Sequence, residues 1–270
     1  MGTTNVGFSL YHSKGSGSKA MNEKIKIENL HKSFGPKTVL DGVDLSVYRG
    51  EILCVIGKSG TGKSVILKNL VGILTPDSGT ITVDGTEFTG ADEKTRFSIQ
   101  KKYGVLFQGA ALFDSMNIYD NVAFGLRRKN ISEDEIARLV PEMLAHVGLK
   151  DIGEKRPSEL SGGMQKRVGL ARSIAIRPEI MLYDEPTTGV DPITAGAVDR
   201  LILKMRDTFG ITSIVVTHDM NSAYRIADRV AMLFDGKISF TGTPEELQNT
   251  DDPAIRQFIE GRANGPVKIA

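Results

Sequence analysis

Cysteine is nearly absent from this sequence, since Cys54 is the single cysteine among 270 residues. One cysteine cannot form a disulfide within the chain, so an internal disulfide is excluded and a reducing compartment is favoured. An excess of one charge is also absent, because 34 Lys and Arg residues are balanced by 33 Asp and Glu residues and the net charge is +1. Bulk charge therefore gives no reason to expect a nucleic-acid partner, and we predict none.

Long hydrophobic runs are absent as well. A membrane-spanning helix needs about 20 consecutive apolar residues, whereas the apolar runs here are short, such as Ile52 to Ile56. Residues 1–21 are polar, rich in Gly, Ser and Lys, and lack the apolar core of a signal peptide, so we predict a disordered leader there. If the protein works at a membrane, partner subunits must supply the spanning helices, and membrane contact is made only through them.

The sequence does have an ordinary globular composition, with 40% hydrophobic and 25% charged residues. Apolar and polar residues alternate in Ile25 to Leu30 and in Val43 to Val47, which predicts half-exposed strands of an antiparallel region. The uniformly apolar run Ile52 to Ile56 predicts a buried central strand. Later apolar runs, separated by helical stretches, lie at residues 180–183, 212–216 and 230–234. This alternation indicates an α/β fold with a parallel sheet.

A helical segment is predicted from Ser132 to Val147, opened by a capping box between Ser132 and Glu135. It belongs to a helical subdomain that we place at about residues 110–165. We expect the main α/β domain to span residues 22–242 and a helical tail to span residues 243–270.

The tail has a clear helix start at Asp252-Pro253. In this helix Ile255, Phe258 and Ile259 share one face. Two alternatives are open for this apolar face, which either packs against a partner or a second copy of the chain, or packs on its own domain.

A glycine-rich loop follows the buried strand, and an amphipathic run from Val65 to Leu74 follows the loop. The loop matches the pattern G-x-x-x-x-G-K-[ST] and predicts a site for the phosphates of ATP. The loop residues predicted to bind ATP are Gly57, Lys58, Ser59, Gly60, Thr61, Gly62, Lys63 and Ser64. Glycines let several backbone N–H groups point at phosphate oxygens, and the N-terminus of the next helix adds to the attraction. The Lys63 ammonium can neutralise the β- and γ-phosphates, and the Ser64 hydroxyl can bind Mg²⁺.

Two carboxylates, Asp184 and Glu185, follow the apolar run at residues 180–183. Asp184 can hold Mg²⁺ through its water shell. Glu185 would orient and polarise the water that attacks the γ-phosphate. Solvated acids at the end of a strand are the alternative, and the phosphate loop favours the catalytic interpretation.

The segment LSGG at residues 160–163 stands between the phosphate loop and the two acids, and a helix start rich in Gln, Lys and Arg follows it. With these motifs the chain resembles the ATP-binding cassette (ABC) family over about residues 23–240. The resemblance implies a P-loop NTPase fold with a RecA-like parallel-sheet core, an antiparallel β subdomain and a helical subdomain. It also implies an ATPase that uses ATP and Mg²⁺. In the implied dimer, Ser161, Gly162 and Gly163 of one subunit contact the nucleotide held by Lys63 of a second copy.

The resemblance assigns four further residues. Phe34 takes the place of an aromatic that stacks on adenine, with a core aromatic as the alternative. Gln108 resembles the glutamine that senses Mg²⁺ and contacts the membrane subunit, with a solvated loop residue as the alternative. His218 resembles the histidine that contacts the γ-phosphate, with a structural histidine as the alternative, and Asp191 resembles the aspartate of the dimer contact.

Two positions depart from the family pattern. Val65 replaces the hydroxyl residue that often follows the loop, so a side-chain contact to the α-phosphate is missing. The segment from Thr188 to Asp191 differs from the commoner S-G-L-D or S-A-L-D, which affects the details of the subunit contact. Neither departure removes a catalytic group.

A narrower resemblance is to the ATPases of Mla/Mce-type phospholipid transport, in residues 57–80, 105–127 and 253–267. It implies a complex with a transmembrane permease, an Mce-domain substrate-binding subunit and a small STAS-domain subunit. The complex would lie in the bacterial inner membrane, with this chain as a peripheral subunit on the cytoplasmic face. Its cargo would be phospholipid moved between the inner and outer membranes, which maintains the lipid asymmetry of the outer membrane.

Three other functions compete with this interpretation. Another ABC importer, for amino acids or small solutes, would share every catalytic motif. An ABC protein of DNA repair would carry long coiled coils, but the interval between Ser64 and Ser161 is short and lacks heptads, and a translation-type protein would carry two cassettes. A nucleotide-binding scaffold without activity is disfavoured by the intact set Lys63, Asp184, Glu185 and His218.

Overall fold

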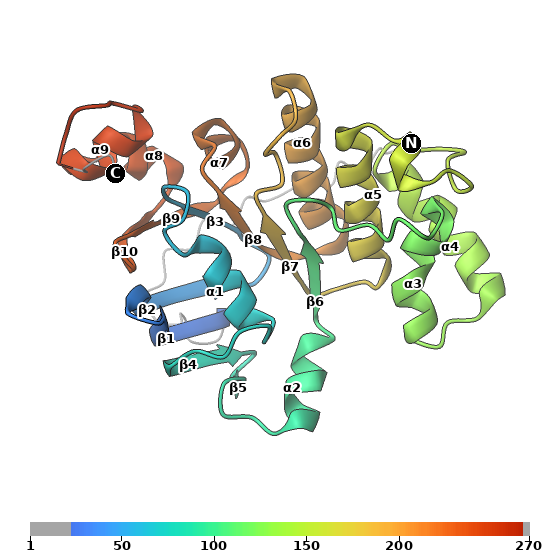
Figure 1. Cartoon of the computed structure of the whole chain (residues 1–270), viewed down its shortest axis with the longest axis horizontal. Coiled ribbons are helices and arrows are strands. Elements are labelled where there is room, and N and C mark those ends of the chain that lie inside the picture. The colour runs from blue at the N-terminus through green and yellow to red at the C-terminus, as the bar shows by residue number, and fades with distance from the viewer. Residues whose placement is uncertain (1–22, 267–270) are drawn as a thin grey trace, which may run out of the picture.

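The computed structural model describes residues 23–266, and its centre is a six-stranded sheet in the order β10-β9-β3-β8-β7-β6 (Figure 1). The strands are β3 (Ile52–Ile56), β6 (Tyr103–Leu106), β7 (Ile180–Asp184), β8 (Thr212–Thr217), β9 (Arg229–Phe234) and β10 (Lys237–Gly242). All neighbours pair in parallel except β10, which runs antiparallel to β9. All five residues of β3 are buried, as expected for a strand with both faces covered. The predicted central strand and parallel sheet are confirmed.

A second, antiparallel sheet of order β2-β1-β4-β5 lies beside the first (Figure 1). Its strands are β1 (Glu23–Phe34), β2 (Lys37–Tyr48), β4 (Ser78–Val83) and β5 (Thr86–Glu87). Ile25 in β1 pairs with Val47 on one side and with Val83 on the other, and all three side chains are fully buried. The alternation of apolar and polar residues in β1 and β2 therefore predicted both the strands and their antiparallel pairing.

Alternate residues of β3 point into two different hydrophobic cores, as the pleat of a strand requires. Leu53 and Val55 belong to a core shared with the antiparallel sheet and α1 (Lys63–Leu70). Cys54, which is fully buried, belongs to a second core shared with the helices on the opposite face. These helices include α6 (Pro192–Phe209) and α7 (Met220–Ile226). Because β3 is packed on both faces, its carboxyl end, where the loop to α1 begins, is held in a fixed position.

Three helices, α3 (Ile118–Arg128), α4 (Glu133–His146) and α5 (Gly162–Ala175), pack together at one end of the molecule (Figure 1). At the start of α4 the Ser132 hydroxyl accepts a hydrogen bond from the Glu135 N–H at 3.3 Å, which is one half of the predicted capping box. The Glu135 carboxylate lies 3.9 Å from Arg138. Because α5 contacts α3, α4 and also β6, this helix connects the helical part to the central sheet.

Helix α1 is shorter than the predicted run from Val65 to Leu74, because it ends at Leu70. Gly72 has φ +76°, a left-handed conformation, and an added Cβ there would lie 2.9 Å from the ring of Phe88. Elements that the sequence did not single out include β5, β10, α2 (Glu93–Gln100) and the 3-10 turn η2 (Pro157–Glu159).

The tail forms α8 (Pro244–Gln248) and α9 (Pro253–Ile259). Asp252 begins α9 as predicted, since its carboxylate accepts the backbone N–H groups of Ala254 and Ile255. Ile255 is only 3% exposed and belongs to the second core, against which Phe258 and Ile259 also pack. The apolar face therefore packs on its own domain, which is the second of the two predicted alternatives.

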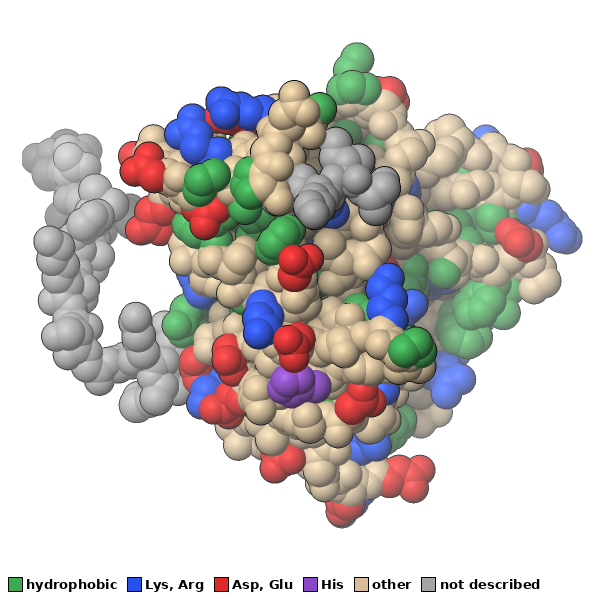
Figure 2. Space-filling model, turned by 60° about the vertical axis from the view of Figure 1, so that its left-hand side comes forward, with side chains coloured by type: hydrophobic (Ala, Val, Ile, Leu, Met, Phe, Trp, Pro, Cys, Tyr) green, Lys and Arg blue, Asp and Glu red, His purple; other side chains and the backbone are tan. Residues whose placement is uncertain are grey.

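Among residues 23–266, no helix is both long and apolar enough to cross a bilayer. On the face shown in Figure 2, acidic and basic side chains are interspersed rather than gathered into one patch of each sign. The predicted leader, residues 1–21, lies outside the described residues.

Candidate functional site

A cleft of about 480 Å³ opens at the carboxyl ends of the parallel strands. Loops that follow β3, β6, β7 and β8 contribute to it, together with the start of α1. In open α/β sheets this edge is the usual place for a ligand. Its lining residues are Val39, Ser59, Gly60, Gly62, Lys63, Ser64, Val65, Gln108, Glu185, Thr188 and His218. The structure thus brings together side chains that the sequence predicted from four separate motifs.

The backbone of the loop between β3 and α1 requires glycine at two places. Gly57 has φ +152°, and an added Cβ would lie 2.4 Å from the carbonyl oxygen of Leu233. Gly62 has φ +106° and would place a Cβ 2.7 Å from the side chain of Val39. Any side chain at either position would displace the loop, so these two glycines fix its close curl against neighbouring chain segments.

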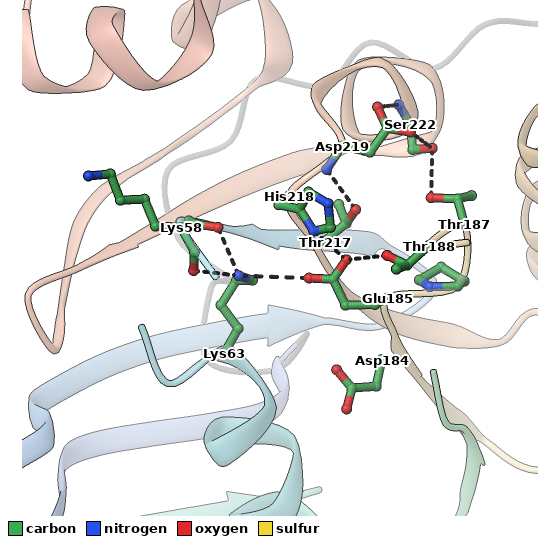
Figure 3. Close-up of polar contacts among 12 residues, drawn as sticks. Lys58, Lys63, Asp184, Glu185, Thr187, Thr188, Thr217, His218, Asp219 and Ser222 are labelled. Atoms are coloured by element: carbon green, nitrogen blue, oxygen red, sulfur yellow. Dashed lines mark hydrogen bonds and ion pairs between the residues drawn. The ribbon is translucent and has the colours of Figure 1, made fainter. Parts of the chain in front are cut away.

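Lys63 lies at the start of α1 with its side chain almost buried, at 4% exposure. Its ammonium donates to the carbonyl oxygens of Gly57 and Lys58, at 2.8 Å each, and lies 3.8 Å from the Glu185 carboxylate (Figure 3). Burial lowers the pKa of Lys63, and the negative charges of Glu185 and Asp184 oppose this effect. The loop therefore holds a cation inside its own curl, at the place where an anion would enter.

The hydroxyl of Ser64 donates to the Asp184 carboxylate at 2.7 Å. This pair joins the first turn of α1 to the end of β7, and Gln108 lines the same cleft. Hydroxyl, carboxylate and amide oxygens are the hard ligands that Mg²⁺ prefers, and Mg²⁺ commonly takes its remaining ligands from water and phosphate. The donor set fits a magnesium ion.

Glu185 has an unusual backbone conformation, with φ +51°. Its carboxylate accepts a hydrogen bond from the Thr188 hydroxyl at 2.9 Å, and the same oxygen lies 2.7 Å from Nδ1 of His218 (Figure 3). Left-handed conformations of residues other than glycine cost of order 1–3 kcal/mol and gather at functional sites. The structure thus directs the Glu185 carboxylate into the cleft, between Lys63 and His218.

The LSGG segment lies at the start of α5, where Ser161 is the N-cap and its hydroxyl accepts the Met164 N–H at 3.3 Å. Ser161 and Gly162 are exposed. Gly163 packs so closely on α6 that an added Cβ would lie 2.6 Å from Cγ2 of Thr194. None of the three residues from Ser161 to Gly163 is among those that line the cleft. Within one chain, the segment is separate from the phosphate loop.

Three further predicted residues have the following surroundings. Phe34 ends β1 with 47% exposure, so it is not a core aromatic, and the Lys32 ammonium lies 5.7 Å from its ring centroid. Gln108 is exposed in the loop after β6. Asp191 is the N-cap of α6, and a hydrogen bond from the Thr194 hydroxyl at 2.6 Å, together with backbone N–H groups, lowers its pKa.

Sequence reasoning missed two polar residues of the site. Thr188 was noted only as a departure from the family pattern, yet its hydroxyl holds the Glu185 carboxylate. Lys166 was noted only as part of a basic helix start, yet its ammonium reaches the turn after β7. Neither contact can be recognised from the local sequence, because each depends on the conformation of the turn after β7.

The comparison with family models gives one match, described as "ABC transporter", over residues 40–188. The chain is 43% identical over 251 residues to the probable ribonucleotide transport ATP-binding protein mkl of Mycobacterium tuberculosis, covering 93% of this chain and 70% of that protein. It is 39% identical over 234 residues to the intermembrane phospholipid transport system ATP-binding protein MlaF of Escherichia coli, covering 86% of this chain and 87% of that protein.

Among solved structures, the chain is similar to the ATP-binding cassette MJ0796 in a dimeric post-hydrolysis state bound to ADP and phosphate. The TM-score is 0.75 at 30% sequence identity, and the match covers 82% of this chain and 98% of that chain.

Proposed function

Because the chain belongs to the ABC transporter family, as the ATP-hydrolysing subunit of such a transporter, we propose that it drives the movement of phospholipid between the inner and outer membranes. The observation that carries this proposal is the similarity to MlaF, which extends over nearly the whole length of both chains. The proposed partners are a transmembrane permease, an Mce-domain substrate-binding subunit and a STAS-domain subunit. The proposed location is the cytoplasmic face of the bacterial inner membrane.

In the proposed site, the loop of residues 57–64 binds the phosphates of ATP and Phe34 stacks on the adenine. Ser64, Asp184 and Gln108 would hold Mg²⁺, which neutralises charge on the phosphates when bound. The Lys63 ammonium already lies inside the loop, so phosphate oxygens can replace loop carbonyls as its acceptors without a large movement of the side chain.

Glu185 is the proposed acceptor of the proton from the attacking water. A general base must lie within hydrogen-bond reach of the proton it removes, and the Glu185 carboxylate points into the cleft next to Lys63. His218 lies on the other side of this carboxylate and is the proposed contact of the γ-phosphate. The site of one chain is completed by Ser161, Gly162 and Gly163 of a second copy, with Asp191 at the contact between copies, an arrangement supported by the dimeric state of the similar cassette.

A second candidate cargo is a ribonucleotide. It is favoured by one observation, the similarity over 93% of this chain to the mycobacterial protein named for ribonucleotide transport. An importer for amino acids or other small solutes would carry the same ATPase motifs. The three alternatives differ in the membrane partners and in the cargo, not in the chemistry of the cleft.

The test is to isolate the tagged full chain from membranes with its companions, identify them by mass spectrometry, and measure ATP-dependent movement of labelled phospholipid between vesicles. We expect a permease and an Mce-domain protein to co-purify and lipid transfer to require ATP. A complex that carries Glu185→Gln is the matched control, since it should assemble and transfer no lipid. Bound ribonucleotide or amino acid, without lipid transfer by the intact complex, would instead support one of the other cargoes.

A further inference from the structure

Lys166 is a buried cation in the second turn of α5, with 7% exposure. Its ammonium donates to the backbone carbonyl oxygens of Thr188 at 2.6 Å, Pro186 at 2.9 Å and Glu185 at 3.4 Å. All three acceptors belong to the turn between β7 and α6. An ammonium has three protons to donate, and here a single turn of backbone takes all of them.

This turn is the segment that sets the position of the Glu185 carboxylate. Glu185 is held in its left-handed conformation by the turn, and its N–H donates to the carbonyl oxygen of Val216 in β8. Its carboxylate is held by the hydroxyl of Thr188, whose own carbonyl is the closest acceptor of Lys166. Lys166 therefore binds the turn at the residue that carries the carboxylate and at the residue that orients it.

Charge supports the same role. Burial lowers the pKa of Lys166, and the negative charge of Glu185 opposes this effect. The Glu185 carboxylate lies 3.8 Å from one cation, the Lys63 ammonium of the phosphate loop. The backbone carbonyl of Glu185 accepts a hydrogen bond from a second cation, Lys166.

Lys166 also lies close in sequence to the LSGG segment, because Ser161 is the N-cap of the same helix. A helix is a stiff element, so a displacement at its first turn is transmitted to the second. Under the proposed function, the first turn of α5 contacts the nucleotide of a second copy, whereas Lys166 contacts the turn that carries the chain's own Glu185.

We propose that Lys166 is a positioning residue for the ATPase reaction. It fixes the turn that holds the Glu185 carboxylate. It also connects two parts of the paired site, namely the start of α5, which contacts the nucleotide of the second copy, and Glu185, which acts on the nucleotide bound by its own chain. This inference rests on the proposed pairing of two copies around ATP. If Lys166 only supplied hydrogen bonds to buried carbonyl groups, its substitution would not change kcat more than KM.

The experiment compares Lys166→Met, Lys166→Arg and Lys129→Met in the full chain purified with its companion subunits. Met keeps the unbranched, flexible shape of the side chain, one atom shorter, and removes the ammonium with its three donor protons. Lys129 is the matched control, because its ammonium donates to the carbonyl oxygen of Ile176 at the opposite end of α5. The measurements are kcat and KM for ATP, binding of a fluorescent ATP analogue, and the melting temperature.

For Lys166→Met we expect kcat to fall roughly tenfold to a hundredfold, as for other displaced catalytic groups, with KM and ATP binding within about twofold of the wild type. Lys166→Arg, which restores donors, should recover most of kcat, and Lys129→Met should leave kcat unchanged. A kcat for Lys166→Met within twofold of the wild type, or an equal loss in Lys129→Met, would overturn the inference. If Lys166→Met does not fold, Lys166→Gln takes its place, because one short amide cannot donate to all three carbonyl oxygens that Lys166 reaches. A kcat of this variant within twofold of the wild type would contradict the proposal. The readout is ATP hydrolysis, so a cargo other than phospholipid would overturn the proposed function without changing this result.

Discussion

The carboxylate of Glu185 has three polar neighbours in the cleft, Lys63, Thr188 and His218. Glu185→Gln keeps the size and the hydrogen-bond acceptor of the side chain but removes its ability to take a proton. Because general-base catalysis contributes about 10²- to 10⁴-fold, we predict that this variant loses ATP turnover by that order while its affinity for ATP is kept. Phosphate release and binding of a fluorescent ATP analogue measure the two effects separately.

The control for this prediction is Lys63→Ala, in which the cation of the phosphate loop is removed. We expect this variant to lose ATP binding itself, because it removes the ammonium that lies inside the curl of the phosphate loop. Hydrolysis that persists in Glu185→Gln would show that another group takes the proton.

At the scale of single residues, the sequence predicted most of the cleft. Lys63 and Ser64 follow glycines that let the backbone curl around a phosphate, so the loop motif identified them. Asp184 and Glu185 were identified because they follow an apolar strand. The sequence did not predict that His218 contacts Glu185 at 2.7 Å, because this distance depends on β7 and β8 being neighbours. The left-handed conformation of Glu185 was also hidden, since glutamate has no preference for it.

At the scale of elements, α5 and α6 approach each other closely at Gly163. Gly163 in α5 meets Cγ2 of Thr194, a branched side chain whose hydroxyl is held by Asp191. Gly163→Ala should therefore lower the free energy of unfolding by about 1–3 kcal/mol, as overpacking does in well-packed contacts. The neighbouring Gly162→Ala is the matched control, because nothing lies within 4 Å of its added Cβ. Urea denaturation measures both changes.

A second substitution tests the cause. Thr194→Ser removes Cγ2 and keeps the hydroxyl that donates to Asp191, so it should restore most of the stability of Gly163→Ala. If the two substitutions are simply additive, the contact between these side chains is not the source of the loss.

Elements differ in how well the sequence predicted them. β3 and the start of α9 were predicted because their signals are local, namely a continuous apolar run and an Asp-Pro start. The position of the apolar face of α9 was left open, because Ile255 joins a core built from residues distant in sequence. The early end of α1 at Leu70 was missed. Gly72 is left-handed there, and a Cβ added to it would lie 2.9 Å from the ring of Phe88, a residue distant in sequence.

At the scale of the whole molecule, one chain presents a phosphate loop and a separate LSGG segment that does not line the same cleft. We predict that Ser161→Arg leaves the binding of ATP to one chain within about twofold of the wild type. In the Glu185→Gln background, the same substitution should abolish the ATP-dependent dimer, because a bulky cation would occupy the place of the partner's phosphate. Light scattering with and without ATP measures the dimer.

The discriminating comparison is with Lys63→Ala in the same background. Both variants should remain monomeric, but only Lys63→Ala should fail to bind ATP. If Ser161→Arg loses ATP binding to the same degree, the LSGG segment acts on the nucleotide of its own chain and the paired arrangement is wrong.

The burial of Cys54 in β3 has a practical consequence. Burial raises the pKa of its thiol, which keeps the thiol protonated and unreactive. Since this is the single cysteine of the chain, new cysteines placed on the surface can be labelled with spin probes or dyes without first altering the native one. One probe near the phosphate loop and another near the start of α5 would then record directly, in solution and in real time, whether two copies close and reopen with each round of turnover.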